Sequence, residues 1–351
     1  MTATGLGLID MGSPFDDIRA LMASFPDADE RASDAVRLRD SQLAKPAGSL
    51  GRLEELAVWM AAWQADDKPH VTRPLVCVFA GNHGVVAQGV SAFPADVTRL
   101  MLDAFGAGGG TINQICASFD FGFKAFDLAL EMPTADMTEQ PAMDEKSCVA
   151  TMAFGMEALA GGVDLLGLGE MGIGNTTAAA AIYAALYGGD PDRFVGHGAG
   201  ADEAQMHRKR QAVRKALALH HEALSDPLEI LRRLGGREIA AMAGAIMAAR
   251  LQRVPVVLDG YVVTAAAAIL HALDSHSIDH CVAGHLSAEG AHAEVLAHLG
   301  LQPVLSLGMR LGEASGAALA MVMIKAAVAC HNGTHTLAQV GIGADPAASK
   351  H

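Results

Sequence analysis

The sequence predicts an α/β protein in which helices pack on a parallel β-sheet. The first observation is a repeated order of short apolar run, glycine-rich loop and helix, which is typical of parallel strands joined by crossover helices. The second is the composition, which is 51% hydrophobic, 18% charged and only 5% aromatic, and which disfavours a β-sandwich. The third is the length of 351 residues, enough for one large domain or two closely joined ones with a substantial core.

Charge and cysteine content narrow the class of protein. The net charge of −14 argues against nucleic-acid binding, which needs a basic surface, and against binding to anionic membranes. The N-terminus lacks a basic region followed by an apolar run, and the apolar stretches are broken by Gly or polar residues, so we expect neither a signal peptide nor a membrane span. The five cysteines form no CxxC pair, and Cys77 and Cys281 lie in apolar runs that indicate buried thiols. We therefore expect a cytoplasmic protein.

The hydrophobic periodicity places the elements along the chain. Strands are expected over 74–80, 120–130, 163–167, 254–258 and 280–283. Helices are expected as two patterns within 14–44, then over 52–64, 94–118 with a break at 106–110, 143–160, the alanine-rich stretch after Thr177, 201–222, 237–252, 261–273, 288–299 and 314–331. The strand ends near 81, 169, 259 and 285 should then meet at one edge of the sheet, where ligand crevices form.

Glu313 is the first candidate for chemistry. It lies in the segment 305–321, LSLGMRLGEASGAALAM, where nearly every neighbour is apolar or small. Such surroundings raise the pKa of a carboxyl group, because they disfavour its charged form, and this makes it useful as a general base near neutral pH. The alternative is an exposed acid in the first turn of a helix, favoured by the helix dipole.

The second candidate is the glycine-rich stretch 167–177. Gly167, Gly169 and Gly172 match G-x-G-x-x-G, but Asp190 and Asp192, the acids at the right distance, lie in a turn with no strand before them, so dinucleotide binding is disfavoured. The small residues still allow the backbone to approach a ligand. Asn175 or a neighbouring Thr could cap the following helix, whose free N–H groups make an anion site.

Three polar features have more than one interpretation. The basic triplet 208–210 reads as a solvated helix face at Arg208 and Arg210, while Lys209 could reach a phosphate. The loop 45–52 is either a turn, which we favour, or an anion-binding surface. His83 could be an acid or base, a metal ligand or, most simply, a loop residue that bonds to backbone.

Six blocks, taken together, resemble a known family. They are KPAGSLGRL at 45–53, AGNHGV at 80–85, GEMGIGNTT at 169–177, LDG at 258–260, SAE at 287–289 and MRLGEASGAALAM at 309–321. In this order they resemble the nicotinate-nucleotide:dimethylbenzimidazole phosphoribosyltransferases, which make α-ribazole phosphate for the lower ligand of cobalamin. The resemblance covers about residues 45 to 325.

The resemblance implies a fold and a reaction. The fold is a three-layer α/β/α catalytic domain, 71–324, with a smaller helical domain from 1–70 plus 325–351, in a homodimer. In the reaction, a benzimidazole nitrogen attacks C1′ of nicotinate mononucleotide, nicotinate leaves, and the ribosyl linkage inverts from β to α. The implied partners are these small molecules, with no metal or redox cofactor.

The resemblance also implies roles for individual residues. Glu313 would accept the proton from the attacking base, and Glu170 would be a second acid next to the nucleotide. Lys209 and Ser287 would contact the phosphate. The remaining substrate-binding positions are Gly172, Gly174, Asn175, Thr176, Thr177 and Gly312.

The sequence departs from the family pattern at the base ring. Phe93 and Met101 stand where some members carry Ser and Gln, which would make the base pocket more apolar. Benzimidazole, a methylated benzimidazole and a purine all remain possible bases. The glycine-rich loop after Gly196 also replaces a different sequence.

Two other classes of function remain open. One is a non-catalytic nucleotide- or base-binding protein on the same fold. The other is a metal-dependent enzyme that uses His83, His197, His285, His331 or His335. Neither an HExxH nor a CxxC pattern supports the metal enzyme.

Overall fold

The computed structural model describes residues 12–342 and confirms the α/β class. Its six strands form one sheet, in which every neighbouring pair is parallel, in the order β2-β1-β3-β4-β5-β6. The strands are β1 (Pro74–Ala80), β2 (Gly122–Asp127), β3 (Leu165–Met171), β4 (Val256–Leu258), β5 (Cys281–His285) and β6 (Pro303–Leu305).

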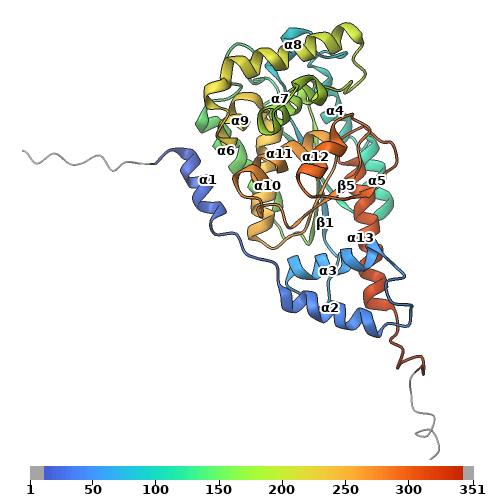
Figure 1. Cartoon of the computed structure of the whole chain (residues 1–351). Helices are drawn as coiled ribbons and strands as arrows, with labels where there is room; N and C mark the ends of the chain where they lie inside the picture. The colour runs from blue at the N-terminus through green and yellow to red at the C-terminus, as the bar shows by residue number, and fades with distance from the viewer. Residues whose placement is uncertain (1–11, 343–351) are drawn as a thin grey trace, which may run out of the picture.

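Thirteen α-helices, with short 3₁₀ turns between some of them, connect and cover the strands in this part of the chain (Figure 1). They are α1 (Pro14–Met22), α2 (Glu30–Gln42), α3 (Arg52–Gln64), α4 (Val97–Gly106), α5 (Thr111–Phe119), α6 (Glu145–Met156), α7 (Asn175–Tyr187), α8 (Glu203–His220), α9 (Pro227–Leu234), α10 (Arg237–Leu251), α11 (Tyr261–Leu273), α12 (His292–His298) and α13 (Ser315–Gly333).

The sheet is the middle of three layers, because helices cover both of its faces. Successive residues of a strand point to opposite faces and so join different cores. In β1, Cys77 and Phe79 join the core formed with α6, α7, α10 and α11. Val76 and Val78 join the other core, formed with α3, α5 and α13. Both faces are covered, which explains why β1 reads as a continuous apolar run. Cys77 and Cys281 are buried thiols, as predicted.

The end of α13 forms a small lobe with α2 and α3, at the foot of Figure 1. Leu43 and Thr336 form an isolated antiparallel bridge. Arg39 donates to the backbone oxygens of His331, Asn332 and Thr334. Segments from the two ends of the chain therefore hold each other in one lobe.

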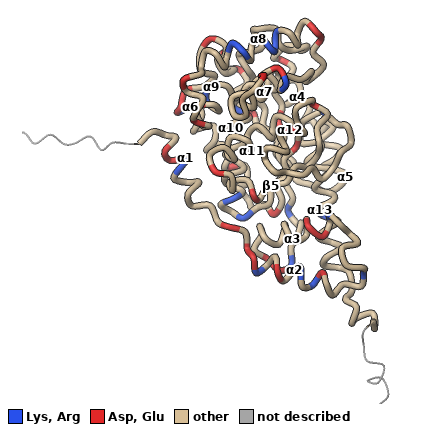
Figure 2. Tube along the Cα trace, viewed as in Figure 1, with Lys and Arg blue, Asp and Glu red and all other residues tan. Residues whose placement is uncertain are grey.

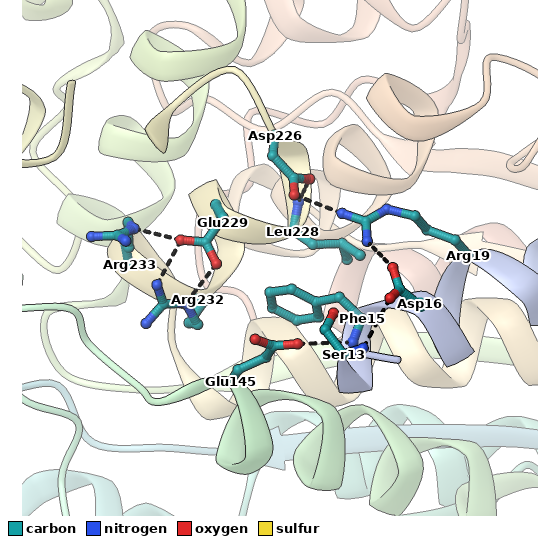
Figure 3. Close-up of polar contacts among 10 residues, drawn as sticks. All are labelled: Ser13, Phe15, Asp16, Arg19, Glu145, Asp226, Leu228, Glu229, Arg232 and Arg233. Atoms are coloured by element: carbon teal, nitrogen blue, oxygen red, sulfur yellow. Dashed lines mark hydrogen bonds and ion pairs between the residues drawn. The ribbon is translucent and has the colours of Figure 1, made fainter. Parts of the chain in front are cut away.

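Helix α1 departs from the expected helical domain, because it lies on the α/β body. Three of its apolar side chains are buried in the core next to α6 and α9. The backbone N–H of Phe15 donates to Glu145 at 3.0 Å, and Arg19 pairs with Asp226 at 2.6 Å (Figure 3). These contacts attach α1 to the body rather than to the lobe.

Helix α13 is the one described helix that is long and apolar enough to cross a membrane. It packs against β3, β4 and β5, and half of its most apolar stretch is buried inside the protein. Ala317, Met321 and Ile324 belong to the core on that face of the sheet. These contacts are those of a core helix.

Strand β3 continues beyond the predicted 163–167, because glycines that read as loop residues allow close packing. A Cβ on Gly167 would lie 2.6 Å from the sulfur of Met321. A Cβ on Gly169 would lie 2.1 Å from the backbone nitrogen of Ala314. Strand glycines often mark such close approaches, so they do not end the strand here.

Other boundaries also differ from the prediction. The strand β6 and the helix α9 were not predicted, and α12 begins at His292 rather than 288. Both missed elements are short, and β6 has only three residues. Short elements give the periodicity too few positions to register.

Candidate active site

A cleft lies where the carboxyl ends of β3, β4, β5 and β6 meet, as the parallel order predicts. About 680 Å³ of space without protein atoms lies within the cleft, and this volume includes open solvent at its mouth. The segments that follow these strands line it, with Gly172 after β3, Gly260 after β4, Ser287 after β5 and Gly312 after β6. The predicted site residues Glu170, Asn175 and Thr176 line it as well.

Glu170 lies at the end of β3, with its carboxyl group on the cleft. Its pKa is raised to about 8, chiefly by burial and also by the nearby acids Glu238, Asp259 and Glu313, while the hydrogen bond from Asn175 opposes the rise. Glu170 is therefore largely protonated at neutral pH and can donate a hydrogen bond to a ligand.

Gly312 lets the Glu170 carboxyl group approach, because a Cβ on Gly312 would lie 2.7 Å from Glu170 Oε1. Its φ of 84° also favours glycine.

Glu313 is one residue beyond Gly312 and is buried, with 5% of its surface exposed. Burial raises its pKa, and its Oε2 atom has no hydrogen-bond partner. The interpretation as an exposed first-turn acid is therefore wrong. Glu313 itself is not among the residues that line the cleft, although its neighbour Gly312 is. A sheltered carboxyl oxygen without a partner can accept a proton from a ligand that reaches it.

The backbone at Glu313 is strained. Glu313 and Ala314 are both left-handed, with φ of 60° and 64°. Non-glycine residues rarely adopt this conformation, and such strain gathers at functional sites. The Glu313 N–H donates to the backbone oxygen of Glu170 at 3.3 Å, which joins this turn to the end of β3.

Asp259, which follows β4, was quoted in the sequence but not predicted as a site residue. Burial raises its pKa to about 7, although backbone N–H groups at the start of α13 oppose the rise. Its Oδ1 atom lies 3.7 Å from Nε2 of His285, which lines the cleft. A third acid with a raised pKa therefore lies next to the cleft, beside His285.

His83 and Glu238 form a second unpredicted pair, with both side chains almost fully buried and His83 Nε2 2.6 Å from Glu238 Oε1. His83 therefore bonds to a carboxylate and not, as we favoured, to backbone. A Cβ on Gly236 would lie 2.2 Å from the His83 ring, so the pair depends on that glycine. Glu238 is also one of the acids that raise the pKa of Glu170.

The glycine-rich stretch 167–177 differs in detail from the prediction. Gly174, at a φ of 95°, caps α7, and no side chain provides the cap. Asn175 instead is the first residue of the helix and donates from Nδ2 to Glu170 Oε2. It serves the site by holding the acid rather than by capping. Thr177 is fully buried.

Lys209 lies in a second cavity, next to the main cleft. It lines this smaller cavity together with Gly174, and the cavity shares Gly172, Asn175 and Thr176 with the main cleft. Its Nζ atom donates to Thr176 Oγ1 at 3.0 Å. Burial lowers its pKa to about 8, so it is mostly charged at neutral pH.

Phe93 and Met101 lie outside the residues that line the two cavities. Phe93 is 47% exposed, and Met101 is half-buried against the core formed with α13. Their contact with a base stays a prediction.

The two arginines beside Lys209 are less solvated than expected. Figure 2 shows the Lys and Arg segments along α8. Arg208 and Arg210 are half-buried; Arg208 donates to the backbone oxygen of Gly89 at 2.7 Å, and Arg210 lies 3.9 Å from Asp192.

The loop 45–52 is a turn, as favoured. Lys45 pairs with Asp40 at 2.9 Å and with Glu54 at 2.7 Å, so its charge is already matched within the lobe.

Within residues 12–342, no group of three or more His, Cys, Asp and Glu side chains could hold a metal ion.

Comparison with known proteins identifies the class of enzyme. The chain matches, over residues 25–342, the family model described as phosphoribosyltransferase. The chain is therefore a phosphoribosyltransferase. The chain belongs to the nicotinate-nucleotide–dimethylbenzimidazole phosphoribosyltransferase family.

Relatives with this name match nearly the whole chain. One from Methylocella silvestris is 63% identical over 330 residues, which are 94% of this chain and 97% of the relative. One from Rhizobium rhizogenes is 60% identical over 331 residues, 94% and 98% of the two chains. The crystal structure of CobT from Thermus thermophilus is similar, with a TM-score of 0.84, 41% identity, and coverage of 90% of this chain and 100% of that chain.

Proposed function

We propose that this enzyme transfers the phosphoribosyl group of nicotinate mononucleotide to 5,6-dimethylbenzimidazole or a related base. The products are α-ribazole 5′-phosphate and nicotinate, and the reaction contributes the lower ligand of cobalamin. Relatives of 60–63% identity are named for this reaction.

The buried, unpartnered Glu313 carboxyl group is the observation that carries the proposal. The attacking ring nitrogen uses its lone pair to form the bond to C1′, while the bond from C1′ to nicotinate breaks and nicotinate leaves with that electron pair. The other ring nitrogen loses its proton, which Glu313 accepts. Its raised pKa makes Glu313 a stronger base once it is ionised.

The other end of the site suits the nucleotide. Glu170, protonated at neutral pH, can donate a hydrogen bond to the sugar or to the leaving group. Lys209 and Thr176 lie together where a phosphate would gain charge-assisted hydrogen bonds. Ser287 lines the main cleft, to which Thr176 also belongs. Gly172, Gly174 and Gly312 have no side chains, so the ligand can contact their backbone directly.

Several properties are proposed with the function. These are a homodimer, a cytoplasmic location, an apolar base pocket that includes Phe93 and Met101, and a division into helical (1–70 plus 325–351) and catalytic (71–324) domains. We modify the division by assigning α1 to the catalytic domain, because its apolar side chains are buried there. Sedimentation of the purified chain tests the dimer.

The test is release of nicotinate from nicotinate mononucleotide and dimethylbenzimidazole, with Glu313→Gln as the variant. General-base removal should lower kcat roughly 10²- to 10⁴-fold. Glu139→Gln, at an exposed acid in a turn after β2, is the matched control. Unchanged release in Glu313→Gln would refute the role of Glu313. Binding of both substrates by the unaltered enzyme without turnover would favour a non-catalytic binding protein.

A further inference from the structure

A glycine-rich loop, 195–200, runs from the end of the 3₁₀ turn at Pro191–Phe194 to the start of α8. Its residues Gly198 and Ala199 line the cleft. Gly198 and Gly200 have φ of 54° and 110°, a conformation that other residues rarely adopt. Glycines restrict the backbone little, so the loop needs contacts from outside to keep one shape.

Three charged side chains provide these contacts. The N–H of Gly198 donates to both carboxyl oxygens of Glu289, at 3.0 and 3.2 Å. Arg310 donates to the backbone oxygen of Gly198 at 2.9 Å, and Lys209 donates to that of Gly196. The loop is therefore held by its backbone, with Glu289 the sole acceptor among the three.

The loop fits closely around Glu289. A Cβ on Gly196 would lie 1.9 Å from Glu289 Oε1, and a Cβ on Gly198 would lie 2.8 Å from Thr176 Oγ1. Glu289 itself is 7% exposed. Its own N–H donates to Ser287 Oγ at 3.2 Å. One residue thus joins the loop to Ser287, and all three line the main cleft next to the smaller cavity that Lys209 lines.

We propose that Glu289 is a positioning residue, which fixes the 195–200 loop so that Lys209, Thr176 and Ser287 meet the phosphate of the nucleotide in one geometry. This inference rests on the proposed function, because it takes the phosphate of nicotinate mononucleotide as the ligand. Glu289 acts through the loop, and its effect falls on binding of the phosphate rather than on the chemical step.

Steady-state kinetics test the inference with Glu289→Ala, Glu289→Gln and the control Glu139→Ala, at an exposed acid in a turn after β2. Glu289→Ala should raise the KM for nicotinate mononucleotide about tenfold, the change that corresponds to one lost charge-assisted hydrogen bond, and leave kcat within about threefold. Nicotinate riboside, used as substrate or as competitive inhibitor, lacks the phosphate, so its KM or inhibition constant should change less than about threefold. Glu289→Gln keeps one neutral acceptor and should fall between.

Amide hydrogen exchange of peptides covering 195–200 measures the anchoring without turnover. Exchange should be faster in Glu289→Ala than in the unaltered enzyme or in Glu139→Ala. Unchanged exchange, or equal losses for the nucleotide and the riboside, would overturn the inference. If the unaltered enzyme released no nicotinate while exchange responded to Glu289, the proposed reaction would be wrong and the loop anchor would stand without its phosphate role.

Discussion

Replacement of Glu170 by Gln should make the stability of the protein less sensitive to pH. Below pH 4.5, the carboxyl group is protonated in both the folded and the unfolded chain. As the pH rises from 4.5 to about 8, the unfolded chain releases the proton while the folded chain keeps it. The free energy of unfolding therefore falls over this range and is constant, for this group, above it.

The size of the effect follows from the raised pKa. At about 1.4 kcal/mol per pH unit, the rise from 4.5 to about 8 corresponds to at most roughly 5 kcal/mol. The glutamine side chain of the variant stays neutral at every pH, and its amide oxygen can still accept the hydrogen bond from Asn175. The variant should be similar to the unaltered protein near pH 4.5 and increasingly more stable than it up to pH 8.

Urea unfolding at several pH values, followed by the fluorescence of Trp59 and Trp63 on α3, measures the difference. Glu139→Gln, at an exposed acid, should give a curve parallel to that of the unaltered protein. Parallel curves for Glu170→Gln as well would mean that Glu170 is already ionised at neutral pH in the folded chain. The buried acid cluster would then not raise its pKa, and the reasoning would be refuted.

Two further predictions concern the phosphate end and the packing of β3. Lys209→Met should raise the KM for nicotinate mononucleotide roughly 10- to 100-fold; in the unaltered enzyme the KM should itself rise above pH 8, as the lysine, with a pKa of about 8, loses its charge. An unchanged KM in both experiments would contradict the assignment. Gly169→Ala should lower the free energy of unfolding by about 3 kcal/mol or more, because its Cβ would meet the backbone of Ala314 at 2.1 Å. Gly106→Ala, where a Cβ meets nothing within 4 Å, is the control in thermal melts, and equal melting of the two variants would contradict the close packing.

Much of the site could be predicted because its parts follow strands. Glu170, Gly172 and Ser287 each lie at the end of an apolar run, and the parallel order brings those ends together. The burial of Glu313 could be predicted from its apolar neighbours. These are local patterns, which a single sequence displays.

The features that escaped prediction depend on contacts between distant segments. His83 and Glu238 are 155 residues apart, and no spacing rule joins them. The left-handed backbone at Glu313 depends on the close approach of Ala314 to Gly169, which reads in the sequence as a loop glycine. Asn175 looked like a cap, because the preceding Gly174 gave no sign that it would take that position itself. Tertiary packing decides such cases.

Helix α13 begins two residues after Glu313 and ends in the lobe of α2 and α3. Its 19 residues form one unbroken rod of about 28 Å. Because the helix is continuous, a tilt of the lobe would move Glu313 relative to the end of β3, where its N–H bonds to the backbone of Glu170. A molecule that binds to the lobe and tilts it would therefore shift the position of Glu313.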